Sequence, residues 1–159
     1  MVDATFTPDM CTILKSLVGQ RLVSLECERL EQTRETYGNL LITTESQRVE
    51  LINEEEPTEY LGDIEDISCF TCRRLKPNEH FRQFVMGEEP MKYPLLGKVN
   101  KASIINDAIA LTRENYAIQL SMAVVLNTDA GEVAFLRGWH FDEMITVVHM
   151  MITDGSFGP

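Results

Sequence analysis

Six consecutive residues, GWHFDE (138–143), bring together the side chains that general acid–base chemistry most often uses. They contain the single tryptophan of the chain, Trp139, together with the imidazole of His140 and the carboxylates of Asp142 and Glu143. A histidine and a carboxylate within hydrogen-bonding reach of a bound molecule can move a proton to or from it. One hypothesis is therefore a ligand pocket lined by these four side chains. The alternative, which we favour, is a wide turn whose aromatic residues close one end of the core.

A second pattern, Cys69-Phe70-Thr71-Cys72, has the CxxC spacing of redox and zinc sites. A redox thiol needs a lowered pKa, which a helix N-terminus supplies, whereas this motif lies in a strand-like stretch that follows several acidic residues. A structural zinc ion needs four ligands, and His80 alone does not complete the set. We therefore expect both cysteines to be packing residues, and we expect neither a metal ion nor a cofactor.

The acidic stretch between Glu54 and Asp66 is the strongest candidate for binding. It contains no Lys or Arg, and Pro57 interrupts it, so we expect a solvated loop. An acidic loop can attract and hold a basic protein surface, as inhibitors and toxin-neutralising immunity proteins often do. The residues expected to bind such a partner are Glu54, Glu55, Glu56, Glu59 and Asp63.

Composition limits the classes of function that fit the chain. It has 159 residues, of which 44% are hydrophobic, enough for one domain with a core. Its net charge of −11 argues against binding to nucleic acid or to an anionic membrane surface. The first residues do not resemble a secretory signal, so we expect the four cysteines to be thiols and the protein to be cytoplasmic.

Hydrophobic spacing predicts a mostly β fold (α+β) with one N-terminal helix. The helix is expected to begin at Pro8 and to end at Gly19, a natural C-terminal cap. About eight antiparallel strands are expected, and for the last of them a short helix is the alternative. The strands are predicted at residues 20–31, 39–44, 48–53, 64–73, 98–111, 116–126, 132–137 and 141–152.

A short motif occurs twice, as TRETYG at residues 33–38 and as TRENYA at residues 112–117. Gly19 and Gly97 precede the two copies at similar distances. We interpret the pattern as an internal duplication within one domain (1–159); the alternative is that two β-meanders share turn chemistry without common descent. Each copy of the motif is expected to be a turn. Each unit would be a four-stranded meander with one apolar face, and the two would cover each other as a sandwich or barrel. Unit one spans about 17–75, unit two spans about 95–152, and residues 76–94 connect them.

Three functions are compatible with these patterns. The first is a non-enzymatic protein-binding module that uses the acidic loop; the absence of a nucleophile motif and of a phosphate-binding Gly-rich loop favours it over an enzyme. The second is a small-molecule-binding or enzymatic barrel with its site near Trp139 and His140. The third is a structural homo-oligomer in which exposed strand edges pair between subunits.

Overall fold

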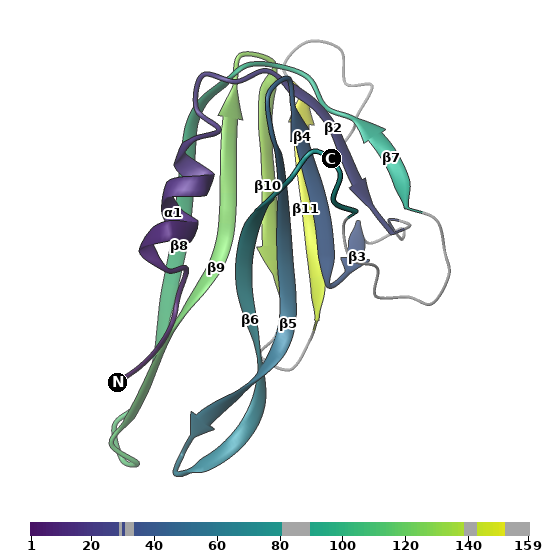
Figure 1. Cartoon of the computed structure of the whole chain (residues 1–159). Coiled ribbons are helices and arrows are strands. Elements are labelled where there is room, and N and C mark those ends of the chain that lie inside the picture. Colours follow the sequence, from purple (N-terminus) through teal and green to yellow (C-terminus); the bar gives the residue numbers. More distant parts are fainter. Residues whose placement is uncertain (29, 31–33, 81–89, 139–142, 152–159) are drawn as a thin grey trace.

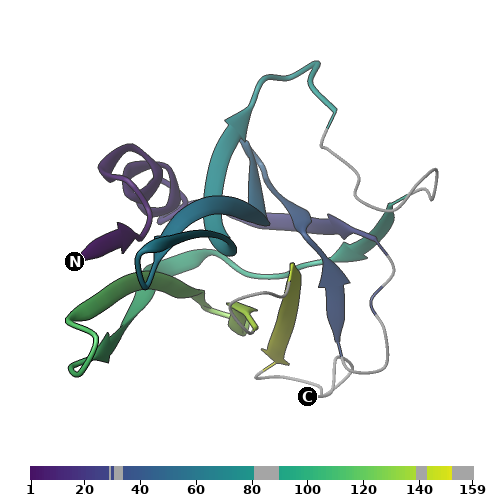
Figure 2. The same cartoon turned by 90° about the horizontal axis from the view of Figure 1, so that it is seen from below.

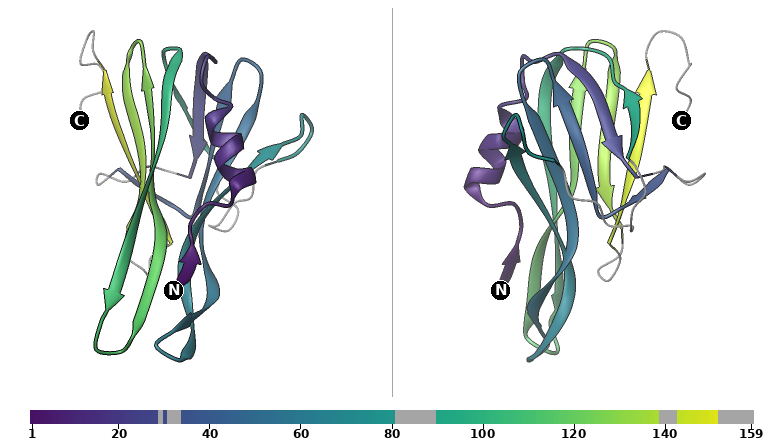
Figure 3. Two further views of the ribbon diagram at one scale, coloured as in Figure 1. Left: turned by 90° about the vertical axis from the view of Figure 1, so that its left-hand side faces the viewer. Right: turned by 45° about the vertical axis from the view of Figure 1, so that its right-hand side comes forward.

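The computed structural model describes residues 1–159 except 29, 31–33, 81–89, 139–142 and 152–159. Within the described residues, one helix and eleven strands are present, and the strands form two facing sheets (Figure 1). The left panel of Figure 3 shows the two sheets as separate layers. The predicted class, a mostly β fold with an N-terminal helix, is confirmed, and its form is a sandwich.

Each sheet contains one of the two predicted four-stranded meanders. The five-stranded sheet has the order β6 (Asp63–Leu75), β5 (Arg48–Tyr60), β4 (Asn39–Thr44), β2 (Leu22–Cys27) and β7 (Met91–Pro94). The other sheet runs from β8 (Val99–Leu111) through β9 (Tyr116–Thr128), β10 (Gly131–Arg137) and β11 (Met144–Met151) to β3 (Glu35–Tyr37). A sixth strand, β1 (Val2–Ala4), pairs in parallel with the part of β9 that β10 does not reach.

Eight of these strands correspond to the eight that the sequence predicts, including β11, for which a helix was the alternative. The other three, β1, β3 and β7, have only three or four residues each and were not predicted. The common origin of the two meanders remains a prediction. Their long hairpins occupy different places: β5 and β6 are the last two strands of the first meander, whereas β8 and β9 are the first two of the second.

The core lies between the two sheets and is completed by α1 (Pro8–Lys15). Phe70 on β6 and Phe135 on β10 are its largest fully buried side chains. Viewed from below, α1 lies at one open side of the sandwich, near β6 and β8 (Figure 2), and it inserts Leu14 into the core. Burying each such side chain contributes about 1.5–3 kcal/mol. This helix is too short to cross a membrane, and the described residues contain no other helix.

The helix begins as predicted but ends earlier. The hydroxyl of Thr7 accepts a hydrogen bond from the amide of Met10, which caps the N-terminus. The last helical residue is Lys15 and the C-cap is Ser16, so the predicted end at Gly19 is wrong. Gly19 instead follows a tighter turn with φ +88°, and its amide donates to the carbonyl of Val99, which joins this turn to β8.

The acidic stretch is exposed, but it is a β-hairpin, so the prediction of a loop before the strand at 64–73 is wrong. β5 and β6 pair continuously from Arg48 with Leu75 to Tyr60 with Asp63. Leu61 and Gly62 connect them with φ values of 55° and 87°, the positive pair that a type I′ turn requires. We call the end of this hairpin, Glu54–Asp66, the acidic arm.

Two features of the register explain why so acidic a segment forms strands. Each of the seven carboxylates in the acidic arm faces an uncharged residue on the opposite strand, so no two face each other directly. The nitrogen of Pro57 points away from β6, as do the amides of Asn53 and Glu55, which bond to groups outside the hairpin. Since that edge of β5 has no neighbouring strand beyond Ile52, proline removes no ladder hydrogen bond there.

The first copy of the repeated motif is not a turn. Residues 31–33 lie outside the described residues, but Glu35–Tyr37 forms β3, which pairs with β11 in the six-stranded sheet. The second copy is a turn at residues 112–115, and it ends where Tyr116 begins β9. The predicted equivalence of the two motifs is therefore wrong at the level of local structure.

Candidate functional site

The acidic arm carries an unusual concentration of exposed charge. Six of its seven carboxylate side chains are exposed, and Glu54 is half-buried. The two ion pairs that the structure shows between described residues both involve Arg73, which contacts Glu50 at 2.7 Å and Glu79 at 2.9 Å. The exposed carboxylates therefore have no cationic partner among the described residues. They are Glu55, Glu56, Glu59, Asp63, Glu65 and Asp66.

Along the acidic arm, one edge of β5 faces away from β6 and has no neighbouring strand, but backbone groups on it already have hydrogen-bond partners. The amide of Asn53 donates to the carbonyl of Gly38 at 2.5 Å, and the amide of Glu55 donates to Oε2 of Glu143 at 3.0 Å. Pro57 has no amide hydrogen, and the carbonyl of Glu59 accepts from the hydroxyl of Tyr116. An added strand would find these backbone groups already bonded. Along this edge of β5 the arm exposes side chains rather than free backbone donors, whereas β6 is the edge strand of its sheet and pairs only with β5.

The acidic arm packs beside a second arm, which is the end of the β8–β9 hairpin (residues 107–120). The views of Figures 1 and 3 show both hairpins extending beyond the sandwich. A small apolar cluster joins them, in which Ile67 packs with Tyr116, Ile118 and Leu120. The ring of Tyr116 also contacts that of Tyr60 at a centroid distance of 5.2 Å. These contacts hold the acidic arm in one position, which lowers the entropy that binding would cost.

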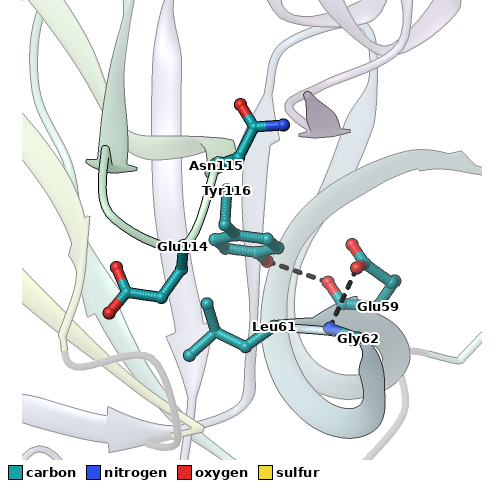
Figure 4. Close-up of a pocket in the computed structure, with 6 residues that line it drawn as sticks. All are labelled: Glu59, Leu61, Gly62, Glu114, Asn115 and Tyr116. Atoms are coloured by element: carbon teal, nitrogen blue, oxygen red, sulfur yellow. Dashed lines mark hydrogen bonds between the residues drawn. The ribbon is translucent and has the colours of Figure 1, made fainter.

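An open cleft of about 330 Å³ separates the tips of the two arms (Figure 4). The hydroxyl of Tyr116 donates to the carbonyl of Glu59 at 2.8 Å, and Oε1 of Glu59 accepts from the amide of Gly62 at 3.1 Å. The lining offers two carboxylates, an amide, a phenol and an apolar side chain. The lining residues are Glu59, Leu61, Gly62, Glu114, Asn115 and Tyr116.

Burial and nearby charge affect the phenol in this cleft. Burial, the charge of Glu59 and the neighbouring Tyr60 raise the pKa of Tyr116, in that order of importance. The neutral phenol is therefore favoured, and a neutral phenol can donate to the carbonyl of Glu59. The phenol therefore stays protonated at neutral pH and remains able to donate this hydrogen bond.

The predicted pocket near the tryptophan is only partly described. Trp139, His140 and Asp142 lie outside the described residues, so the hypothesis of an acid–base site there stays a prediction. Glu143 is described, and it lies at the base of the acidic arm: its side chain binds the amide of Glu55, and its carbonyl accepts from the amide of Gly38. In these contacts Glu143 has a structural role.

The CxxC cysteines differ in burial, as expected for a strand. Cys72 lies in the main core and Cys69 is half-buried. Burial is the main cause that raises the pKa of both thiols, to about 12 for Cys72. For Cys69, the carboxylate of Glu56 also raises the pKa, but it is the smallest influence. Among the described residues, no group of three or more potential ligands is placed to hold a metal ion.

No sequence pattern predicted Leu61, Glu114, Asn115 or Tyr116 as site residues. The dipeptide Leu61-Gly62 was the available signal, because a glycine between two β-forming stretches favours a tight hairpin. No local signal places Glu59 beside Tyr116, since the two are far apart in the chain.

Comparisons with protein-family models, with curated proteins and with solved structures found no match to this chain.

Proposed function

We propose that the protein is a non-enzymatic binding module whose acidic arm recognises a basic surface on another protein. The observation that carries this proposal is the set of six exposed carboxylates on a folded hairpin, without a cationic partner among the described residues. Opposite charge on a partner would raise the association rate and fix the orientation of binding.

Two apolar side chains at the tip add to this surface. Ile64 is 70% exposed, and apart from Met1 it is the most exposed large hydrophobic residue in the described part of the chain. Leu61, at the turn, is also exposed. Apolar groups that become buried at the centre of an interface contribute more to affinity than rim charges do. The partner we propose therefore presents an apolar depression surrounded by Lys and Arg.

The test compares two variants that have the same net charge. In the arm variant, Glu54, Glu55, Glu56 and Glu59 become Gln. In the control variant, four acidic residues outside both arms become the matching amides: Asp9, Glu35, Glu45 and Glu132. Both changes alter the net charge of −11 by four units and leave side-chain shape almost unchanged. Each protein is immobilised and exposed to native cell extract, and bound proteins are eluted with a salt gradient.

We expect at least one basic protein that the wild type and the control retain and that the arm variant loses. Its elution should move to lower salt when fewer carboxylates contact it. Equal retention by both variants would show that overall charge, and not the acidic arm, determines binding. Retention of nothing by the wild type would also contradict the proposal.

A further inference from the structure

The strand β6 forms the outer edge of the five-stranded sheet, and part of its backbone points to that edge. Paired residues of antiparallel strands direct their amides and carbonyls alternately toward each other and away from each other. On β5, the amide of Glu55 and the carbonyl of Glu59 point away from β6. Glu59 pairs with Ile64, and the next residue of β6 with the same orientation is Asp66. The backbone groups of Ile64 and Asp66 therefore point away from β5, to the outer edge of the sheet.

No described part of the chain occupies this edge near the tip of the acidic arm. The structure shows no hydrogen bond from the amide of Ile64 or of Asp66 to any described residue. In Figure 1, the lower end of β6 has β5 on its left and no described helix or strand on its right. We call the outer edge of β6 at Asp63–Asp66 the open edge.

Farther from the tip, other parts of the chain lie against β6. Ile67 packs in the small apolar cluster with β9. The ring of Phe6 contacts that of Phe70 at a centroid distance of 5.4 Å, and Sγ of Cys72 donates to the carbonyl of Met10 at 3.5 Å. The open edge is therefore limited to the end of the strand that extends beyond the sandwich.

The two edges of the acidic arm differ in their backbone groups. Along β5, the amides of Asn53 and Glu55 are bonded within the chain, and Pro57 has no amide hydrogen. Along the open edge, the amides that point outward have no such partner among the described residues. Exposed amides and carbonyls on an edge strand are a template for pairing with another strand. The open edge can therefore accept a strand that the edge of β5 cannot.

Charge on the open edge determines which strand can pair there. The side chains of Asp63 and Glu65 point to one face of the hairpin, and those of Ile64 and Asp66 point to the other. Like charges on neighbouring strands oppose pairing, and opposite charges favour it. A second copy of the open edge would place carboxylates beside carboxylates, whereas a strand with Lys or Arg would meet them with opposite charge. The charge thus selects a basic strand.

We propose that the open edge accepts an extended basic segment of the partner protein as an added antiparallel strand. This inference rests on the proposed function and specifies how the partner is bound. Antiparallel pairing is slightly more stable per residue than parallel pairing. The four added residues then face Asp66, Glu65, Ile64 and Asp63, in that order. Because Ile64 is apolar and 70% exposed, the expected segment is basic, basic, apolar, basic.

The backbone of the added strand provides a direct test of this geometry. The first and third of the four added residues face Asp66 and Ile64, so their amides and carbonyls point toward β6. The amides of the second and fourth point away from β6. A methyl group on an amide nitrogen removes the donor and obstructs close approach of another strand. Methylation of the first and third residues should therefore prevent strand addition, whereas methylation of the second and fourth should not.

The experiment uses the full chain and short peptides. The probe is the peptide TKKVKT with acetylated and amidated ends, which contains the expected pattern. The edge-blocked peptide carries N-methyl groups on its second and fourth residues, and the control peptide carries them on its third and fifth. All three peptides have the same charge. Binding at low salt is followed by NMR of the isotope-labelled protein with up to about 5 mM peptide, which detects a Kd of about 1 mM or lower.

A matched pair of variants tests the same point on the protein. Ile64→Pro removes one donor from the open edge and leaves the ladder between β5 and β6 intact, because proline is tolerated where the amide faces outward. Ile64→Ala removes most of the side chain and keeps the amide. Circular dichroism verifies that both variants are folded.

The probe and the control peptide should bind, with the largest NMR shifts at the amides of Ile64 and Asp66. The edge-blocked peptide should bind about tenfold more weakly or not at all. The probe should likewise bind Ile64→Pro about tenfold more weakly than it binds Ile64→Ala.

Two results would overturn strand addition. Equal binding of the two methylated peptides would mean that attraction between side chains is sufficient, which agrees with the proposed function alone. No binding of the probe at low salt would mean that the charge only protects the edge from pairing. The proposed function fails separately, in the extract experiment, whose arm variant changes glutamates of β5 and leaves the open edge unchanged.

Discussion

Two glycines that occupy equivalent places in the sequence repeat should respond differently to the same substitution. Gly19 and Gly97 both have positive φ, of +88° and +100°. At Gly19 an added Cβ meets no atom within 4 Å. At Gly97 it would lie 2.5 Å from Oγ1 of Thr128 and 2.9 Å from Oδ1 of Asp129. Gly19→Ala thus tests the backbone conformation alone, and Gly97→Ala tests conformation and packing together.

At both positions, alanine in a conformation with positive φ lowers the free energy of unfolding by a similar amount. A non-glycine residue in a left-handed conformation costs about 1–2 kcal/mol, and replacing glycine recovers about 0.4–1 kcal/mol by restricting the unfolded chain. Gly19→Ala should therefore lower the free energy of unfolding by about 1 kcal/mol. The clash at Gly97 adds about 1–3 kcal/mol, as overpacking usually does, so Gly97→Ala should cost about 3 kcal/mol.

The clash falls on a group that cannot move freely. Oγ1 of Thr128 accepts from the amide of Ala130 and donates to the carbonyl of Gly131 at 2.8 Å, which closes the β9–β10 turn. Displacing Thr128 breaks these hydrogen bonds. Oδ1 of Asp129 is likewise held, because it accepts from the amide of Lys98 at 2.8 Å.

Urea unfolding and thermal unfolding followed by circular dichroism measure the difference. For a chain of this length, each kcal/mol lowers Tm by about 2–4 °C. Gly19→Ala should lower Tm by about 2–4 °C and Gly97→Ala by about 6–12 °C. Equal shifts for the two variants would refute the reasoning, because they would mean that the space around Gly97 is not as close-packed as the structure shows.

Three further predictions concern single side chains. Tyr116→Phe removes the donor to the Glu59 carbonyl and should lower the free energy of unfolding by about 1 kcal/mol. Amide hydrogen exchange should become faster in both arms. Unchanged exchange would mean that this hydrogen bond does not link the arms. Burial raises the pKa of Cys27 and Cys72 to about 12. Maleimide at about pH 8 should therefore label these thiols only when the protein unfolds. Rapid labelling of the folded protein would contradict their burial. Burial lowers the pKa of His149 from 6.5. As the pH falls, the unfolded state therefore binds a proton at this histidine before the folded state does. The stability that neutral His149 contributes is present above pH 6.5 and is lost as the pH falls. Below this pH, the free energy of unfolding should depend less steeply on pH in His149→Gln than in the wild type.

The parts of the fold that were predicted correctly carry a strong local signal. In β9, Tyr116, Ile118 and Leu120 alternate with smaller or polar residues, and all three are buried on the small cluster between the arms. Such alternation directly indicates which face of a strand is buried in the folded protein. The turn at Asp129 and Gly131 follows from residue type in the same way, and the β9–β10 hairpin confirms it.

The short strands could not be predicted because long-range pairing creates them. β1 exists because Val2 aligns with Ile118, and β3 because Glu35 aligns with Thr146. Three residues do not show a period. The prediction of where α1 ends was wrong for a related reason. The apolar spacing continues to Leu17, which is buried, although the backbone after Lys15 is no longer helical.

The candidate site was predicted in composition but not in form. Glutamate and proline both disfavour strands, so local propensity at residues 54–59 predicts a loop. Propensity in sheets depends on the partner strand, however, and here the partner supplies Ile67 and Ser68, which are both buried. The cleft between Glu59 and Tyr116 depends on two hairpins that meet only in the folded chain.

The acidic arm is held by contacts that do not use most of its charge. Backbone pairing, the small apolar cluster and the Tyr116 hydroxyl position it. Within the described part of the chain, the side chains of Glu56, Glu65 and Asp66 form no hydrogen bond or ion pair. Carboxylates that lie close together on one hairpin repel each other, weakly, even in water. The charge therefore opposes folding slightly, and neutralising it should leave the free energy of unfolding unchanged or raise it. A segment that lowers stability without structural benefit is the kind of surface that binding to an oppositely charged partner would explain.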